Sequence, residues 1–417
     1  MQADSIVLGA GIVGVSVAIH LQMRGRATVL VDRRGAGEET SYGNAGLIQR
    51  EGALPRAFPQ GLAALFRYGL NNRTDMYYHP DALPRIAPFL ARYWWHSRPD
   101  NYRKVVNAYA PLIAASISEH APLIELAGAG DLIAKEGWYL LYRDAGERDA
   151  AFREAEWLSR DFGIGHQQLG GDEMVRREPG VGAKLAGALH WTDPWSIREP
   201  GGLVVKYREL FEGLGGTVVT GDAMRLEPGT SGAGWRLPLA VEVLEAREAV
   251  IALGPWAGDL TGRLGYRLPL EVKRGYHMHY AQPEAQPLRH WMLDASYGYL
   301  LAPMVRGIRL TTGAEFALRD APPTPVQVDR DEPLARQLFP GLGKRLDAEP
   351  WRGARPVTPD MMPIIGPAPR HEKLWFAFGH AHHGMTLGPA TGRLIAEMVT
   401  GEQPFIDPAA FSAARFL

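Results

Sequence analysis

The sequence predicts an α/β protein with a Rossmann-like dinucleotide-binding domain, assembled from separated segments, and a second domain with a mainly antiparallel sheet. Three observations support this prediction: a strand, glycine turn and helix at the N-terminus, a later strand that runs into Gly254, and loosely alternating segments between Leu264 and Asp347. Strands that lead through glycine into helices are typical of nucleotide-binding domains, whereas two-residue alternation is typical of antiparallel sheets.

These patterns divide the chain into two predicted domains. With 417 residues, the chain is long enough to bury two cores. Because the nucleotide-binding pattern returns more than 200 residues after it first appears, the intervening segments are expected to form the second domain. The dinucleotide-binding domain is predicted to comprise residues 1–85, 196–263 and 348–417, and the substrate-binding domain residues 86–195 and 264–347.

The first dinucleotide-binding signal is a turn between a strand and a helix with the residues Gly9, Ala10, Gly11, Ile12, Val13 and Gly14. Gly9 permits a tight turn, Gly11 lets backbone N–H groups approach a pyrophosphate, and Gly14 lets the helix pack closely on the strand. The helix N-terminus adds the positive end of a dipole. Asp32 ends the next strand, where a carboxylate accepts hydrogen bonds from the adenosine ribose hydroxyls.

A loop rich in small residues follows Asp32. Its glycines allow close backbone approach, and its hydroxyl and amide groups suit a pyrophosphate and a ring edge. The alternatives are a flexible surface loop and, for the arginine that follows Asp32, a solvated surface charge. Cofactor contacts are expected from Arg33, Ser41, Asn44, Ala45, Gly46 and Leu47.

Charge and composition exclude several classes of protein. Lys and Arg number 45 against 46 Asp and Glu, so no bulk charge attracts the chain to nucleic acid. The chain has no apolar run long enough to span a membrane and no basic segment before its first apolar stretch, so a cytoplasmic enzyme is expected. Peripheral contact with the inner face of the membrane stays open. Because cysteine is absent, disulfides, thiolate nucleophiles and cysteinyl cofactor links are excluded.

The C-terminal segment carries a second helix start. A turn-rich segment from Trp351 crosses into a strand, and a later glycine-rich turn opens a helix that reaches Val399. The positive end of such a helix suits the edge of a reduced flavin, which carries negative charge. No metal site is expected from His380, His382 and His383, because carboxylates are missing at ligand spacing and adjacent histidines on a turn rarely converge.

Together these motifs resemble those of the FAD-dependent D-amino-acid oxidase superfamily, and within it most closely the bacterial D-amino-acid dehydrogenases. The resemblance implies the glutathione-reductase-2-type flavoenzyme architecture. It also implies non-covalent FAD, since cysteine is absent and no histidine lies between His20 and His79 to link the ring. The motifs that carry the resemblance are Gly9–Gly14 with Asp32, Ser41–Gly46, Ala249–Gly254, Gly353–Asp360 and Gly379–Thr386.

The reaction implied by the resemblance is oxidative deamination of a D-amino acid. The Cα hydride passes to flavin N5, and the imino acid hydrolyses to a 2-oxo acid and ammonia. The alternatives are a glycine or sarcosine type of oxidase that uses oxygen, and a non-catalytic FAD-binding subunit. The electron acceptor can be a quinone, a protein or oxygen, and the aromatic residues favour an apolar or cyclic substrate such as a D-proline derivative.

The resemblance also implies roles for individual residues. Arg355 would hold the substrate carboxylate, because a planar guanidinium pairs with it through two hydrogen bonds. Tyr276 and Tyr299 would donate hydroxyl groups from the sheet, and His380 would lie at the flavin edge. Lys273 and Arg274 fall where relatives carry a basic residue near the ring, and they either assist binding or are plain strand-end charges. Further cofactor contacts are expected from Gly254, Gly384, Met385 and Thr386.

Overall fold

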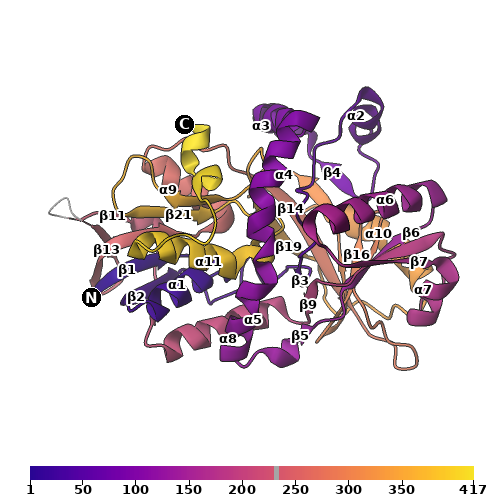
Figure 1. The fold of residues 1–417 in the computed structure, drawn as a ribbon, viewed down its shortest axis with the longest axis horizontal. Helices are drawn as coiled ribbons and strands as arrows, with labels where there is room; N and C mark the ends of the chain where they lie inside the picture. Colours follow the sequence, from indigo (N-terminus) through magenta and orange to yellow (C-terminus); the bar gives the residue numbers. More distant parts are fainter. Residues whose placement is uncertain (230–233) are drawn as a thin grey trace.

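The computed structural model describes residues 1–229 and 234–417, without the side chains of residues 62 and 64. Within this part of the chain, two large sheets lie side by side, and each is covered by its own helices (Figure 1). A small sheet of three short strands lies between them, formed by β3 (Leu47–Ile48), β9 (Trp195–Ile197) and β5 (Ile133–Ala134).

The first sheet is parallel at its centre, in the order β10-β2-β1-β13-β12-β11, with β21 on β13 and β20 on β21. Val7 faces one hydrophobic core, whereas Ile6 and Leu8 face the other. Because both faces are covered, the central strands carry consecutive apolar residues, as at 6–8 of β1 and 29–31 of β2. The strands are β1 (Gln2–Leu8), β2 (Thr28–Asp32), β10 (Thr217–Thr220), β11 (Glu227–Pro228), β12 (Trp235–Pro238), β13 (Val243–Ile251), β20 (Ile364–Pro367) and β21 (Leu374–Phe378).

Two helices that are far apart in sequence pack closely on one face of this sheet. A Cβ added at Gly388 of α11 would lie 2.8 Å from Ile12 of α1, and one at Gly392 would lie 2.6 Å from the backbone of Ser16. Glycine is therefore what allows α1 and α11 to approach. The helices around this sheet are α1 (Ile12–Met23), α8 (Pro200–Gly213), α9 (Ala257–Arg263) and α11 (Gly384–Thr400).

The second sheet is mainly antiparallel, in the order β4-β18-β14-β17-β16-β15-β6-β8-β7, with β19 also paired to β14. Its central strand β14 is almost entirely buried. The strands are β4 (Met76–Tyr78), β6 (Trp138–Tyr142), β7 (His166–Gly170), β8 (Gly187–Trp191), β14 (Glu271–Tyr280), β15 (Met292–Asp294), β16 (Leu300–Met304), β17 (Gly307–Thr311), β18 (Ala314–Phe316) and β19 (Trp351–Val357).

Three groups of helices accompany the second sheet and the region between the sheets. On the second sheet lie α6 (Ala145–Phe162), α7 (Gly171–Arg177) and α10 (Val326–Leu338). Between the sheets run α4 (Pro99–Ala114) and α5 (Ser116–Leu126), which share a core with α1 and α11. At the upper edge of the molecule in Figure 1 stand α2 (Leu62–Gly69) and α3 (Leu83–His96).

The sheets divide the chain differently from the predicted domain boundaries at three segments. Residues 76–78 and 351–357, predicted in the dinucleotide-binding domain, pair with strands of the second sheet as β4 and β19. The segment at 351–357 is also a regular strand rather than a turn-rich one. Residues 99–126, predicted in the substrate-binding domain, instead pack against α11. The apolar pattern of a segment predicts that it is buried, but it does not show which sheet or helix the segment packs against.

Candidate functional site

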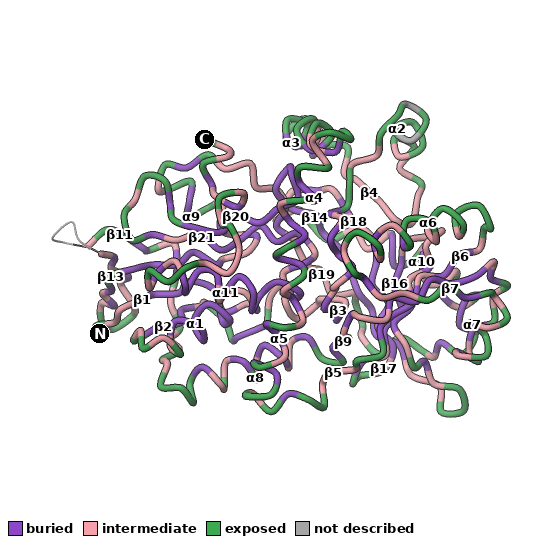
Figure 2. The backbone as a smooth tube through the Cα atoms, in the orientation of Figure 1, coloured by how far each residue is buried: buried purple, intermediate pink, exposed green. Residues whose placement is uncertain are grey.

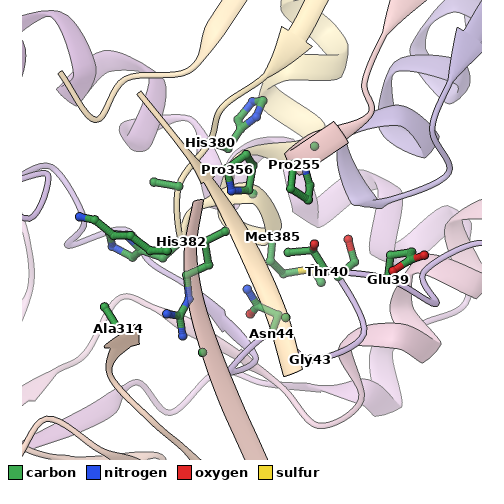
Figure 3. Close-up of a pocket in the computed structure, with 18 of the residues that line it drawn as sticks. Glu39, Thr40, Gly43, Asn44, Pro255, Ala314, Pro356, His380, His382 and Met385 are labelled. Atoms are coloured by element: carbon green, nitrogen blue, oxygen red, sulfur yellow. The ribbon is translucent and has the colours of Figure 1, made fainter. Parts of the chain in front are cut away.

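A long cavity of about 1030 Å³ runs between the two sheets, from the glycine turn after β1 to the strands β14 and β19. Figure 3 shows how separate parts of the chain meet there. Glu39 and Thr40 lie on one side of the view, His382 and Ala314 on the other, and Met385 between them. The N-terminal turn, the loop after β2, the C-terminal turn and both sheets therefore contribute to a single site.

The glycine turn at one end is shaped by backbone contacts that leave no room for a side chain. Gly9 has a φ of 105°, and a Cβ there would lie 2.5 Å from the carbonyl oxygen of Ala252. A Cβ at Gly14 would lie 1.8 Å from the Gly9 oxygen. At Gly11, by contrast, an added Cβ would meet only the Ser41 hydroxyl, at 3.2 Å, on the side of the cavity. The turn therefore presents bare backbone to the cavity.

Asp32 lines the cavity and also holds the glycine turn in place. Its Oδ2 accepts a hydrogen bond from the backbone N–H of Ala10 at 2.6 Å, and its Oδ1 accepts one from Arg34 N–H at 3.0 Å. A carboxylate oxygen can accept more than one hydrogen bond, so both oxygens keep capacity for ribose hydroxyls. The sequence predicted the ribose contact but not this second task.

Side chains of the second sheet hold the loop after β2 in place. Arg309 donates to the carbonyl oxygen of Asn44 at 2.7 Å, and the Asn44 side chain accepts from Gly46 N–H at 2.8 Å. Trp351 lies directly under Gly43, where a Cβ would be 1.8 Å from its ring. The loop therefore packs against the second sheet, as a cofactor-binding loop would.

Arg33 is an exposed charge whose side chain is held at the edge of the cavity. Its guanidinium lies 4.4 Å from the centre of the Trp256 ring and donates to Glu39 at 2.9 Å, and all three residues line the cavity. Gly254, two residues before that tryptophan, also lines the cavity, as predicted.

The N-terminus of α11 opens into the same cavity. Gly384 and Met385 line it, and no side chain caps the first turn of this 17-residue helix. Thr386 does not line the cavity; its hydroxyl donates to Leu47 O at 3.2 Å and so ties α11 to β3. His380 lines the cavity while its Nε2 contacts the Thr391 hydroxyl at 2.9 Å. Burial lowers the pKa of His380 to about 3, so its imidazole is neutral.

At the other end of the cavity, two basic residues lie side by side on neighbouring strands of the second sheet. Lys273 of β14 is directly opposite Arg355 of β19 in the antiparallel register, and both line the cavity. Arg355 donates only to backbone carbonyl oxygens, those of Gly313 at 3.0 Å and Arg274 at 3.4 Å. Among the described residues no carboxylate forms a salt bridge with either Lys273 or Arg355. Burial lowers the pKa of Arg355 to about 10 and that of Lys273 to about 7, and the nearby charge of Arg56 adds to both shifts.

The walls around these cations are largely aromatic and apolar. They come from the segment before α2, from α2 and α3, from β4 and β18, and from the turn after β19. The lining residues here are Phe58, Leu65, Tyr68, Met76, Tyr78, Leu83, Leu90, Tyr93, Phe316 and Met361. This part of the cavity therefore offers an apolar surface around its two cations.

Two tyrosines predicted to donate to the substrate are engaged elsewhere. Tyr299 does not line the cavity, and its hydroxyl donates to Asp294 at 3.2 Å inside the second sheet. Tyr276 does line the cavity, but its hydroxyl donates to Glu315 at 2.9 Å and accepts from Arg274 at 2.8 Å. The alternation in the sequence predicted strands for both side chains, but only Tyr276 lies on one, in β14, whereas Tyr299 directly precedes β16. Alternation also does not show which polar groups a side chain meets.

Three residues at the substrate end of the cavity were not assigned to the site from the sequence. Arg56, from an irregular loop, had no sequence signal at all. Tyr93 of α3 stood out only as one of several aromatic residues, and His382 of the turn before α11 only as a rejected metal ligand. Lys273 did stand out in the sequence, although its position opposite Arg355 depends on a strand register that spacing alone does not reveal.

The cavity fits FAD by the chemistry of its lining. Bare backbone at Gly11 and the start of α1, where the Ile12 N–H donates to the Ser41 hydroxyl at 3.1 Å, suit a pyrophosphate, and Asp32 suits a ribose. The uncapped start of α11 suits an electron-rich ring. These three features line one cavity, and the same cavity contains the basic residues Lys273 and Arg355. Such a cavity can bind a dinucleotide and a small anion side by side.

Comparison with known proteins identifies the class. A family model described as FAD dependent oxidoreductase matches residues 4–398, so the chain belongs to this family. Over 99% of its length the chain is 30% identical to a protein of Bradyrhizobium diazoefficiens named D-amino-acid oxidase, of which it covers 98%. It is 29% identical to the D-amino acid dehydrogenase of Chromohalobacter salexigens, with 99% of each chain covered.

Solved structures show the same fold. Glycine oxidase from Geobacillus kaustophilus superposes with a TM-score of 0.78 at 21% identity, covering 100% of this chain and 99% of that one. L-proline dehydrogenase from P. horikoshii gives a TM-score of 0.76 at 17% identity, covering 100% and 98%. The predicted superfamily, fold class, FAD cofactor and oxidoreductase activity are therefore confirmed. Among the described residues, no helix is both long and apolar enough to cross a membrane.

Proposed function

We propose that this chain is an FAD-dependent dehydrogenase that oxidatively deaminates D-amino acids. The observation that carries the proposal is Arg355, a cavity guanidinium that forms no salt bridge with any described residue and shares its cavity with the dinucleotide turn. Curated relatives that match nearly the whole chain are named D-amino-acid oxidase and D-amino acid dehydrogenase. FAD, when bound, supplies the acceptor for the two electrons of the substrate Cα–H bond.

FAD contacts in this proposal come from residues that line the cavity. Three predicted contacts act indirectly: Gly14 and Gly46 allow close packing of the backbone, and Thr386 ties α11 to β3. The residues proposed to touch FAD are Gly9, Ala10, Gly11, Ile12, Val13, Asp32, Arg33, Ser41, Asn44, Ala45, Leu47, Gly254, His380, Gly384 and Met385.

The chain's own contribution to the reaction is positioning. Arg355 binds the substrate carboxylate, and the apolar walls enclose the side chain and exclude water, which strengthens the pairing of opposite charges. A substrate fixed in this way presents its Cα and amine in one orientation, and orientation of this kind can supply several kcal/mol of a reaction barrier. An apolar or cyclic side chain, such as that of D-proline, suits these walls.

A panel of D- and L-amino acids tests the proposal. FAD-loaded protein is mixed anaerobically with each compound, together with glycine and sarcosine, and the flavin absorption is followed. Bleaching by D-amino acids is the expected result. Bleaching by glycine or sarcosine alone, with peroxide formed at the rate of turnover in air, would favour the oxidase alternative, and no bleaching by any amine would leave a non-catalytic subunit.

We also propose that the enzyme touches an anionic membrane surface through α2, α3 and the start of α4. Between residues 56 and 104, eight Arg or Lys face three Asp, whereas the whole chain carries a net charge of −1. Phe66 is 73% exposed and Trp95 51% exposed, and the guanidinium of Arg98 lies over the rings of both Trp94 and Trp95. Figure 2 shows the exposed upper edge that these helices form.

Exposed aromatic residues beside basic ones are typical of helices that lie in a bilayer interface. The same two helices line the substrate end of the cavity, through Leu65 and Tyr68 of α2 and Leu90 and Tyr93 of α3. Contact would place this end of the cavity at the membrane, on its cytoplasmic face, where a quinone can serve as electron acceptor.

Vesicle binding tests the membrane contact. The protein should sediment with vesicles that contain phosphatidylglycerol at low salt and not with phosphatidylcholine alone, and a Phe66→Ser, Trp95→Ser variant should lose the binding. Val241→Ser is the control, since Val241 is 95% exposed in the turn between β12 and β13. Equal sedimentation of the native protein and the double variant would remove this surface from the proposal.

A further inference from the structure

The pair formed by Lys273 and Arg355 is unusual for two residues whose only task is structural. Residues directly opposite each other in an antiparallel pair have Cβ atoms about 4.5–5.5 Å apart, and like charges there destabilise the sheet. Lys273 is also 9% exposed, so water screens its charge poorly. A basic residue at this position destabilises the sheet whenever it is charged. Its presence beside Arg355 therefore suggests a functional role rather than a structural one.

Arg274, the next residue along β14, shows how this protein treats a structural cation. Its guanidinium donates to Glu315 at 2.6 Å and to the carbonyl oxygens of Leu318 and Pro322 at 3.2 and 2.9 Å. It faces away from the cavity and is fully compensated by a buried carboxylate. In the described part of the chain, Lys273 has no such partner.

The contacts of Lys273 leave its nitrogen available on the cavity side. Nζ donates to the Tyr93 hydroxyl at 2.9 Å and contacts the Met361 sulfur at 3.7 Å. The Tyr93 hydroxyl itself donates to the carbonyl oxygen of Arg56. Because that proton is already directed elsewhere, Tyr93 cannot donate to Lys273, and a lone pair on a neutral Nζ stays free.

The groups around Lys273 favour its neutral form. Burial is the largest cause of its lowered pKa of about 7, and the charges of Arg56 and Arg355 add to it. His382, from the turn before α11, has a pKa well below its ordinary value and contributes no charge at neutral pH. Arg56, Arg355, Tyr93 and His382 are thus the titratable or charged groups that face Lys273 from the surrounding elements.

We propose that Lys273 is the base that removes a proton from the ammonium group of the bound amino acid. One N–H bond of the substrate ammonium breaks and one N–H bond forms at Nζ, leaving a free amine and a lysine ammonium. The substrate carboxylate neutralises Arg355 as it binds, which weakens the repulsion that held Lys273 neutral. Binding of the substrate therefore raises the proton affinity of Lys273 at the stage when Lys273 accepts the proton from the substrate ammonium. The inference rests on the proposed function, because it requires an amine substrate.

An alternative role for Lys273 is to bind the substrate carboxylate together with Arg355. The two tasks differ in what arginine can do in place of lysine. Arginine supplies a permanent cation but cannot accept a proton at ordinary pH. Lys273→Arg therefore keeps a cation that can bind the substrate carboxylate but removes the base, whereas Lys273→Met removes both the cation and the base.

The experiment measures anaerobic flavin bleaching against pH for the native protein and both variants, with the D-amino acid that bleaches fastest in the panel. In the native protein the rate should rise with pH and level off near pH 7. Both variants should lose about 100-fold near pH 7, within the usual range for a general base. Their rising limb should move up by more than about one pH unit, toward the pKa of the amino acid's own ammonium group.

Binding of benzoate, a carboxylate without an amine, gives a readout that needs no turnover. In the native protein its affinity should fall as pH rises through about 7, because Lys273 loses its charge there, and in Lys273→Met it should not change over this range. A native bleaching rate that is flat between about pH 6 and 9, or a Lys273→Arg variant with the native profile, would overturn the inference. These native measurements decide the matter even if a variant fails to fold.

Failure of this inference can be told from failure of the proposed function. If no D-amino acid bleaches the native flavin, the proposed function is wrong. If D-amino acids bleach it with a profile that does not depend on Lys273, the function stands and Lys273 is not the base.

Discussion

The two ends of the cavity are built in different ways. The cofactor end is made of backbone: a glycine turn, two helix starts and a small-residue loop, most of it from neighbouring residues in the sequence. The substrate end is made of side chains that come from β14, β19, α3 and an irregular loop. The first is fixed by local spacing and the second by tertiary register. This difference explains why the cofactor is easier to infer from the sequence than the substrate.

Their electrostatics differ as well. The cofactor end attracts negative charge through partial charges at helix starts and keeps the Asp32 carboxylate hydrogen-bonded to the turn. The substrate end holds the full charge of Arg355 with no salt bridge from any described carboxylate. An anionic cofactor and an anionic substrate are thus bound by different means, and substitutions at the two ends should separate their effects.

The largest effect on cofactor binding is expected at the cofactor end. In Gly14→Ala the new Cβ would lie 1.8 Å from the Gly9 oxygen, so the turn must shift. Overpacking of this kind costs about 1–3 kcal/mol, which corresponds to a loss of roughly fivefold to 150-fold in FAD affinity. The ratio of flavin to protein after purification measures this loss. Gly213→Ala is the control, since a Cβ there meets nothing within 4 Å, and an unchanged flavin content in Gly14→Ala would contradict the packing argument.

At the substrate end, Arg355→Leu should reduce kcat/KM by about 100-fold to 1000-fold, because two charge-assisted hydrogen bonds are lost. The flavin content should stay native, in contrast to Gly14→Ala. Steady-state kinetics with a D-amino acid and the visible spectrum measure the two quantities. Arg352→Leu on the same strand, whose side chain does not line the cavity, serves as control. Normal turnover in Arg355→Leu would remove it from the substrate site.

Between the two ends, Glu51 should make stability depend on pH. Its carboxyl accepts from Gln49 of the cofactor end at 3.1 Å and from Trp138 of the second sheet at 2.8 Å, and burial raises its pKa to about 7. A raised pKa favours the neutral form in the folded state. This contribution is complete below about pH 4.5 and declines as pH rises to about 7, by about 3 kcal/mol at most.

Glu51→Gln should therefore flatten the pH dependence of stability. Relative to native protein, the variant should gain up to about 3 kcal/mol between pH 5 and pH 8. Urea unfolding at both pH values measures the change. Glu349→Gln, at an exposed site, should leave the pH dependence as it is. The prediction is wrong if native protein and Glu51→Gln lose stability in parallel.

The smallest kinetic effects are expected at the two sheet tyrosines. Tyr299→Phe breaks the hydrogen bond to Asp294 and should cost about 1 kcal/mol of stability. Tyr276→Phe removes a hydroxyl that joins Arg274 to Glu315 and should cost somewhat more. Because neither hydroxyl is free to donate to a substrate, KM should change by no more than about twofold in either variant. A tenfold rise in KM for Tyr276→Phe would restore the contact predicted from the sequence.

Most of the residues that the sequence assigned to the cofactor line the cavity, because Gly9, Gly14 and Asp32 act through local turns whose spacing is fixed. Arg355, which the sequence assigned to the substrate carboxylate, also lines the cavity, but β19, which carries it, was mistaken for an irregular segment. Sequence reasoning could not assign the tyrosines, since alternation on a strand gives a face and not a hydrogen-bond partner. Nor could it pair Lys273 with Arg355, because cross-strand register depends on the whole sheet.

The most direct test of the account is a benzoate titration of the FAD-loaded protein, followed through the visible flavin spectrum. The account holds that a carboxylate on Arg355 lies in the same cavity as the flavin. Benzoate should then perturb the spectrum of the native protein at saturable concentrations and have no such effect on Arg355→Leu. Equal binding by both proteins, or binding without any change in the flavin spectrum, would contradict it.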